Sequence, residues 1–109
     1  MNIKISENFI DDARKNSTSP QYRKTLNKLM LVVKMFEKED SINNFLKLPK
    51  IKKIVGKGLK SSNLWEYKID AQNRVVFSIV ETKDEEPMVV LLGLYTIAQF
   101  KDFLYKKNF

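Results

Sequence analysis

The side chains that could do chemistry in this sequence are charged residues and tyrosines, because it contains no histidine and no cysteine. Thiolate metal sites, disulfides and histidine-based triads are excluded, so any acid–base step must use Glu, Asp, Lys, Tyr or Arg. Glu66 and Lys68 alternate with Trp65, Tyr67 and Ile69, so a strand would place both charged side chains on one face. The alternative is that this polar face is simply solvated.

A run of lysines precedes this segment, and no acidic residue lies between Asp40 and Glu66. Lysines that are spaced along a tethered segment can follow a phosphate backbone and make binding depend on salt. We expect Ile51, Ile54 and Val55 to anchor the segment to the core. The alternative is a solvated loop. The lysines of the run are Lys47, Lys50, Lys52, Lys53, Lys57 and Lys60.

The net charge of +7 over 109 residues favours phosphate backbones or an acidic protein as partners. The alternative is a soluble protein that is merely rich in lysine. The length and the composition predict one domain spanning residues 1–109. Residues 1–20 lack the apolar stretch of a secretory signal, and no apolar run is long enough to cross a bilayer. We therefore expect a cytoplasmic protein with no membrane segment.

Hydrophobic periodicity indicates the elements that must position these side chains. Ser19 as N-cap and Pro20 at the first helical position begin the most strongly patterned helix, roughly residues 20–38. Thr96 and Gln99 form a capping-box pair that opens a final helix, with Ile97, Phe100 and Phe103 inward. The remaining elements are a strand at 3–5, a short helix at 9–15, a helical turn at 40–48, and strands at 64–70, 74–80 and 88–94.

This order predicts an α+β fold in which an N-terminal strand and two helices pack on an antiparallel sheet of about four strands, with a C-terminal helix. Strands that are joined by tight turns must be antiparallel. Such a sheet can bury one face under helices and leave the other open. An open, basic sheet face would be a platform for nucleic acid.

The element order and several short segments resemble the RelE/ParE superfamily of bacterial type II toxins, in particular the HigB-like, phage-type branch. The match covers residues 45–95, while the N-terminal helices agree only in length and character. The segments that carry the resemblance are Lys57-Gly58-Leu59-Lys60, Asn63-Leu64-Trp65-Glu66-Tyr67-Lys68-Ile69, Arg74-Val75-Val76-Phe77 and Val90-Leu91-Leu92-Gly93-Leu94.

The resemblance implies the toxin of a toxin–antitoxin pair, which cleaves mRNA through the ribose 2′-hydroxyl, often on the ribosome, and which an antitoxin protein neutralises. It implies no metal and no cofactor. Arg74 matches a position that contacts the scissile phosphate, and Lys68 matches a strand position that is often basic, so both would hold phosphate. Glu66 would act as general base in place of a histidine, and Tyr95 would assist as acid. RNA would be bound by Lys50, Lys52, Lys53, Lys57, Lys60 and Lys101.

The sequence departs from the HigB-like pattern after the last strand, where it reads Leu92-Gly93-Leu94-Tyr95-Thr96-Ile97 without the basic residues of that branch. A second interpretation therefore keeps the fold without the nuclease, as a gyrase inhibitor or a degenerate toxin that binds its antitoxin. A third is an unrelated phage or plasmid regulator that binds nucleic acid. The alternative for Arg74 is a simple ion pair with Asp70 or Glu81, which is worth about 0–1 kcal/mol if it is exposed.

Overall fold

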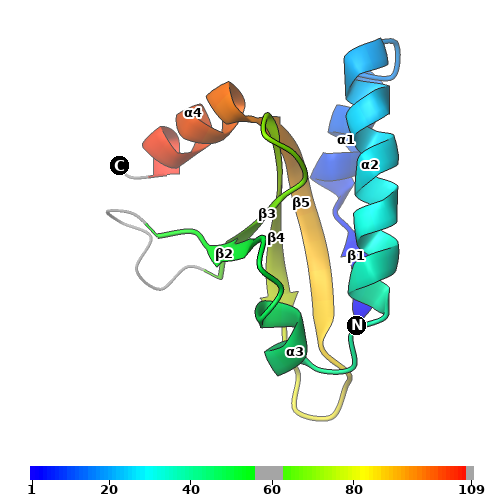
Figure 1. The fold of residues 1–109 in the computed structure, drawn as a ribbon, viewed down its shortest axis with the longest axis vertical. Helices are drawn as coiled ribbons and strands as arrows, with labels where there is room; N and C mark the ends of the chain where they lie inside the picture. Colours follow the sequence, from blue (N-terminus) through cyan, green and yellow to red (C-terminus); the bar gives the residue numbers. More distant parts are fainter. Residues whose placement is uncertain (56–62, 108–109) are drawn as a thin grey trace.

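Five strands form one mixed sheet in the order β1-β5-β4-β3-β2 (Figure 1). The structure is a computed structural model that describes residues 1–55 and 63–107, with side chains through residue 102. Strand β1 runs parallel to β5, and all other neighbours are antiparallel. The strands are β1 (Asn2–Ile5), β2 (Ile51–Lys53), β3 (Trp65–Lys68), β4 (Asn73–Val80) and β5 (Met88–Thr96).

The described residues form four helices beside the sheet, and α2 and α4 lie on opposite sides of it (Figure 1). The predicted α+β fold, with its N-terminal strand and C-terminal helix, is confirmed. The sheet has five strands instead of about four, and it is mixed instead of antiparallel. The helices are α1 (Glu7–Lys15), α2 (Pro20–Glu37), α3 (Ile42–Leu46) and α4 (Ile97–Lys107).

Side-chain caps fix where the helices begin, as the sequence predicts. The Ser19 hydroxyl accepts a hydrogen bond from the Tyr22 N–H at 3.2 Å, and Pro20 occupies the first turn of α2. The Thr96 N–H donates to the Gln99 side-chain oxygen at 3.0 Å while the Gln99 N–H donates to the Thr96 hydroxyl at 3.2 Å. This reciprocal capping box turns the chain from β5 directly into α4.

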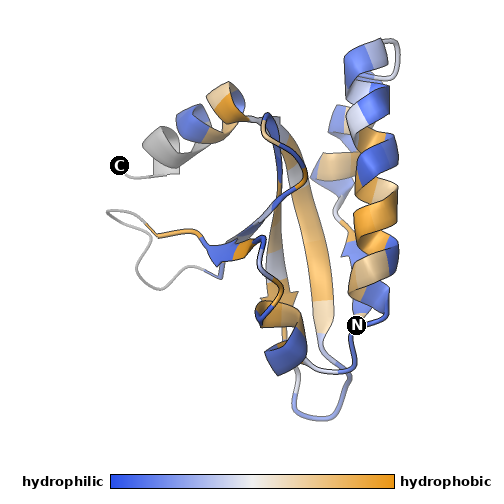
Figure 2. Ribbon diagram, in the orientation of Figure 1, coloured by the Kyte–Doolittle hydropathy of each residue, from blue (hydrophilic) through white to orange (hydrophobic). Residues whose placement is uncertain are grey.

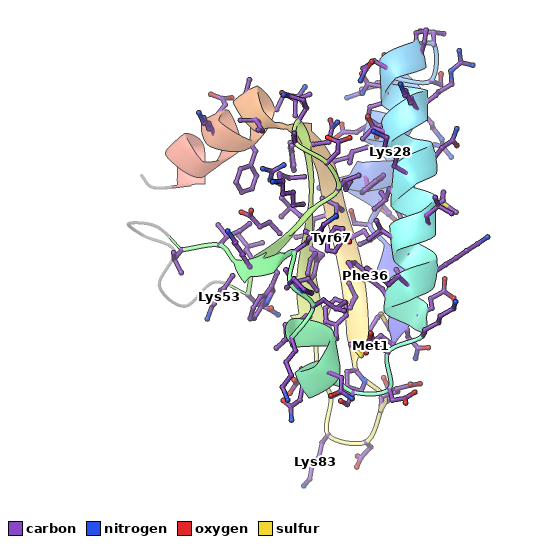
Figure 3. All side chains as sticks on the ribbon, in the orientation of Figure 1. Met1, Lys28, Phe36, Lys53, Tyr67 and Lys83 are labelled. Carbon is purple, nitrogen blue, oxygen red and sulfur yellow. The ribbon has the colours of Figure 1, made fainter. Side chains whose placement is uncertain are left out.

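Four aromatic rings form the centre of the core between α2 and the sheet (Figure 3). Phe36 of α2 meets Phe45 of α3 and Tyr67 of β3 edge to face, with ring centroids 4.8 Å and 5.2 Å away. Phe77 of β4 lies 5.6 Å from Phe45. The three phenylalanines are fully buried, and the apolar residues of β5 and of the adjacent part of α2 surround them (Figure 2).

The opposite face of the sheet, called the open face below, carries a smaller apolar cluster under α4. Val76, Ile54 and Phe100 are buried there. Ile54 packs in this cluster, and Ile51 is buried in the aromatic core on the other face, so both anchor the lysine run as predicted. Val55 is 75% exposed, and the prediction for it is wrong. Strand β2 ends at Lys53, so Val55 lies beyond the strand and is exposed to solvent.

Asp70 ties the turn between β3 and β4 to helix α2. Its carboxylate accepts hydrogen bonds from the Lys28 ammonium at 2.9 Å, from the Gln72 N–H at 2.8 Å and from the Asn73 amide at 3.0 Å. The hydrogen bond from Lys28 is the main reason why the pKa of Asp70 falls from 3.8 to about 2.

Among the described residues, no helix is long and apolar enough to cross a membrane.

Truncating Phe36 should show how much the aromatic contacts contribute to the free energy of unfolding. We expect Phe36→Ala to lower the free energy of unfolding by about 3–5 kcal/mol, because it removes buried surface and leaves a cavity. Leu31→Ala, on the exposed side of the same helix, should change it by less than about 0.5 kcal/mol. Urea unfolding followed by circular dichroism measures both variants, and equal losses would contradict the packing described.

The hydrogen bonds to Asp70 should make the free energy of unfolding depend on pH in the acidic range. Since the folded pKa of Asp70, about 2, lies below the unfolded value of 3.8, its charge stabilises the fold above about pH 4, and this contribution disappears as the pH falls towards 2. At pH 7 we expect Asp70→Asn to cost about 1–2 kcal/mol. The difference in the free energy of unfolding between Asp70→Asn and the wild type should vanish near pH 2. Asp84→Asn, in the exposed loop before β5, is the control, with no expected loss in the same urea series.

Candidate functional site

Three of the predicted residues lie in one row across the open face. The register pairs Lys68 of β3 with Arg74 of β4, and Arg74 with Tyr95 of β5. Neighbouring strands are about 4.8 Å apart, so the main chains at the two ends of this row are about 10 Å apart. The adjacent row contains Lys52, Glu66, Val76 and Gly93.

Glu66 is a largely buried carboxylate at the centre of this face. Its Oε1 lies 3.8 Å from Arg74 Nε, and the two side chains are only 19% and 15% exposed. Burial raises the pKa of Glu66, against the smaller opposing effects of Arg74 and Lys52. A carboxyl group with a raised pKa is a stronger base than an ordinary one, while the adjacent cations still favour its ionised form.

Arg74 is held by the main chain as well as by Glu66. Its Nη1 donates to the carbonyl oxygens of Asp70 at 2.7 Å and of Asn73 at 3.0 Å. Arg74 therefore does contact Asp70, which is one of the two partners in the alternative prediction. The contact is with the main-chain carbonyl of Asp70 and not with its carboxylate. The turn fixes the guanidinium in place, and its Nη2 group lies outside these contacts.

A shallow depression of about 550 Å³ surrounds Glu66, and we call it the basic hollow. Four cations line it against two carboxylates, so its net charge is positive. Lys50 and Lys52 reach it from β2 and the residues before it, as Lys68 and Arg74 do from β3 and β4. The lining residues are Pro49, Lys50, Lys52, Glu66, Lys68, Asp70, Ala71 and Arg74.

Two of the other predicted lysines, Lys53 and Lys101, do not line the basic hollow. Lys53 lies over the ring of Trp65, 5.8 Å from its centroid, and alternation places it on the other face of β2 from Lys52. Lys101 is exposed on α4. Lys57 and Lys60 lie outside the described residues.

Tyr95 lies flat along its own strand, above Gly93. A Cβ atom at Gly93 would come within 2.6 Å of the Tyr95 hydroxyl oxygen and 2.7 Å of its ring carbons, so the ring needs a glycine beneath it. Burial raises the pKa of Tyr95, and the charge of Asp12 raises it further. The hydroxyl therefore stays protonated at neutral pH, over the row that also contains Glu66 and Val76.

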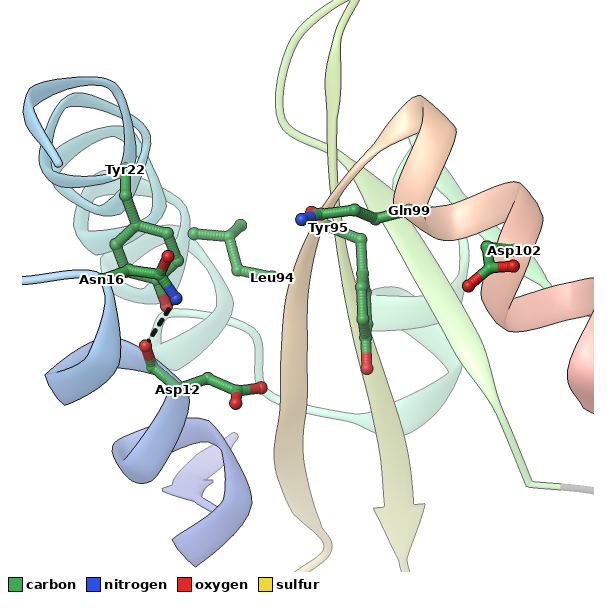
Figure 4. A pocket seen from close by; sticks show the side chains of 7 residues that line it. All are labelled: Asp12, Asn16, Tyr22, Leu94, Tyr95, Gln99 and Asp102. Atoms are coloured by element: carbon green, nitrogen blue, oxygen red, sulfur yellow. Dashed lines mark hydrogen bonds between the residues drawn. The ribbon is translucent and has the colours of Figure 1, made fainter.

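A second depression, of about 370 Å³, borders Tyr95 on the side of α1 and α2 (Figure 4). Asp12 from α1 and Tyr22 from α2 face it, together with Gln99 and Asp102 from α4. Sequence reasoning missed Asp12, because the only signal was the amphipathic pattern around Phe9, which does not say which strand α1 lies beside. In residues 1–55 and 63–107, no group of three or more acidic side chains could hold a metal ion.

No protein-family model matches the chain, and no curated protein sequence matches it. Solved structures do resemble it. The Escherichia coli DinJ–YafQ toxin–antitoxin complex aligns with a TM-score of 0.59 at 17% identity, covering 90% of this chain and 93% of the other. A YoeB/ParE toxin from Agrobacterium tumefaciens gives 0.51 at 15% identity over 88% and 98%. The YoeB–YefM complex from Staphylococcus aureus gives 0.56 at 14% identity over 87% and 94%.

These likenesses establish the fold. The chain has the fold of RelE/ParE-type toxins, as the resemblance in its sequence predicts. The HigB-like branch stays a prediction, as does the role of each site residue.

The contact between Tyr95 and Gly93 can be tested by a double-mutant cycle. Gly93→Ala should cost about 1–3 kcal/mol in urea unfolding, because the added methyl group forces the Tyr95 ring away from the sheet. In a Tyr95→Ala background the same substitution should cost much less, giving a coupling energy of about 1 kcal/mol or more. Additive losses would show that the ring does not lie on Gly93.

Proposed function

We propose that this protein is the toxin of a type II toxin–antitoxin pair and that it cleaves mRNA at the basic hollow. The observation that carries the proposal is Glu66, a largely buried carboxyl group with a raised pKa between Arg74 and Lys52 on the open face. Burying a carboxylate among cations costs solvation energy. Such an arrangement is typical of a group that must accept a proton near neutral pH.

The cleavage uses the ribose of the RNA as the nucleophile. Glu66 takes the proton of the 2′-hydroxyl, O2′ attacks the adjacent phosphorus, and the bond from phosphorus to O5′ breaks. The products are a 2′,3′-cyclic phosphate and a 5′-hydroxyl end, whose proton comes from Tyr95 directly or through water. Lys68 and Arg74 stabilise the negative charge that develops on the phosphorane oxygens. No metal ion or cofactor takes part.

The rest of the RNA follows the lysines. Lys50 and Lys52 contact the phosphates next to the scissile one, and Lys53, Lys57, Lys60 and Lys101 contribute to the longer-range attraction. The same positive surface is complementary to an acidic antitoxin segment, which would neutralise the protein by covering the hollow. A cytoplasmic location follows from the substrate, with the ribosome as the place where mRNA is presented.

In a second candidate function, the protein still pairs with an antitoxin but does not cleave RNA. The observation that favours it is Arg74, whose Nη1 is already engaged by two main-chain carbonyls. The sequence also has no lysine or arginine from Gly93 to Phe100. In this case the protein binds gyrase, or only its antitoxin.

Replacing Glu66, the proposed general base, should distinguish between the two candidate functions. We expect Glu66→Gln, which keeps the shape of the side chain, to slow RNA cleavage by the purified protein about 10²–10⁴-fold. Glu81→Gln, exposed after β4, should cleave like the wild type. Growth and mRNA 5′ ends are recorded after induction in bacteria.

Growth arrest with recurrent new 5′ ends in the wild type, both abolished by Glu66→Gln, is the result that the nuclease predicts. Arrest without new ends would favour gyrase and the second candidate. Full cleavage by Glu66→Gln would remove Glu66 from the mechanism.

A further inference from the structure

A third depression lies on the open face between α1 and β5, and we call it the α1 hollow. Its volume of about 450 Å³ is in the range of small-molecule sites. Ser6 donates its N–H to the Leu91 carbonyl, after which α1 continues beside the second half of β5 and forms one wall. The floor consists of Leu64, Val76, Leu92 and Tyr95, and the wall of Ser6, Asn8, Asp11, Asp12 and Lys15.

The floor of the α1 hollow is apolar. Val76 is fully buried at its centre, and Leu64, Leu92 and Tyr95 are partly exposed around it. The ring of Tyr95 lies along the strand because Gly93 has no side chain. A planar group of the size of a nucleobase would cover this apolar surface and stack against the tyrosine.

The wall of the α1 hollow carries the carboxylates of Asp11 and Asp12 against the single ammonium of Lys15, on a protein that is otherwise basic. Asp11 lies 3.9 Å from Arg14, whereas Asp12 forms no salt bridge with any described residue and borders both depressions beside Tyr95. Its charge reaches the tyrosine, since it contributes to the raised pKa of Tyr95. A carboxylate at this position repels phosphate and favours groups that donate hydrogen bonds.

Only one of the four RNA bases matches a single carboxylate with both of its oxygens. Guanine presents two adjacent donors, N1–H and the N2 amino group, on its Watson–Crick edge. Adenine and cytosine present one donor beside a ring acceptor, which a carboxylate repels, and uracil presents one donor between two acceptors. We therefore propose that the α1 hollow holds a guanine base, stacked on Tyr95 and read by Asp12.

This proposal rests on the proposed function, since the base would belong to the RNA whose phosphate lies in the basic hollow. Tyr95 and Arg74 are cross-strand partners, so the two hollows meet at neighbouring strands about 4.8 Å apart. The guanine would lie next to the scissile phosphate. Asp12 would then decide where the RNA is cut without taking part in the reaction.

The first test is the sequence preference of cleavage. Purified protein is incubated with a pool of randomised RNA, and the new 5′ ends are sequenced. We expect guanine to be enriched at one fixed position next to the cut, and Asp12→Asn to reduce this enrichment about tenfold or more while cleavage continues. Glu7→Gln, at an exposed carboxylate in the first turn of α1 that does not line the hollow, is the matched control and should keep the preference.

The second test does not need cleavage. Guanosine, adenosine, cytidine and uridine 5′-monophosphates are titrated into the protein while NMR signals of Leu92 and Tyr95 are followed, with free arginine as a further probe. We expect guanosine monophosphate to shift these signals at the lowest concentration and Asp12→Asn to abolish that advantage. If arginine shifts them and guanosine monophosphate does not, the hollow accepts a basic protein side chain and the proposal is wrong.

The two tests separate this inference from the proposed function. Cleavage without guanine preference, together with equal binding of the four nucleotides, would overturn the guanine site and leave the nuclease intact. Guanosine monophosphate binding that depends on Asp12 in a protein that cuts no RNA would keep the site and overturn the nuclease. Loss of folding is checked in each variant by circular dichroism, and Glu7→Gln controls for the change of charge in α1.

Discussion

The edge-to-face contact between Phe36 and Tyr67 decides which way the candidate site faces. Since side chains alternate along a strand, burying Tyr67 against α2 forces Glu66 and Lys68 onto the opposite face. A slip of one residue in β3 would bury both charges in an aromatic core, at a cost of several kcal/mol. Phe45 and Phe77 complete the ring contacts around Phe36 and thereby fix β4, which carries Arg74.

Polar contacts around the sheet fix the position of Arg74 on the face that the aromatic core leaves open. Asp70 joins Lys28 of α2 to the turn before β4, and that turn supplies the carbonyls that hold Arg74. The guanidinium therefore stays beside Glu66 without having to be anchored by it. The open face has two electrostatic halves, with cations around Glu66 and carboxylates around Tyr95, and the row from Lys68 to Tyr95 crosses the boundary between them.

Local patterns in the sequence predicted the parts of the fold that depend on local physics. The alternation around Tyr67 and the capping pairs of Ser19 and Thr96 are confirmed because each concerns residues that are near in sequence. The strand Ile51–Lys53 was not predicted, since three residues show no periodicity and become a strand only through pairing with β3. The parallel pairing of β1 with β5 and the α1 hollow likewise depend on residues far apart in the chain.

The pairing of β1 with β5 also has a consequence for how the molecule is made. Asn2 pairs with Met88 and Ile5 with Leu91, so β1 leaves the ribosome well before β5 and must wait until β5 has been synthesised before it can enter the sheet. Closing so long a loop is entropically unfavourable and slow compared with forming the β3–β4 hairpin. Helix α1 reaches its place beside β5 only then, so the nascent polypeptide lacks the surface between α1 and β5 until β5 has been synthesised.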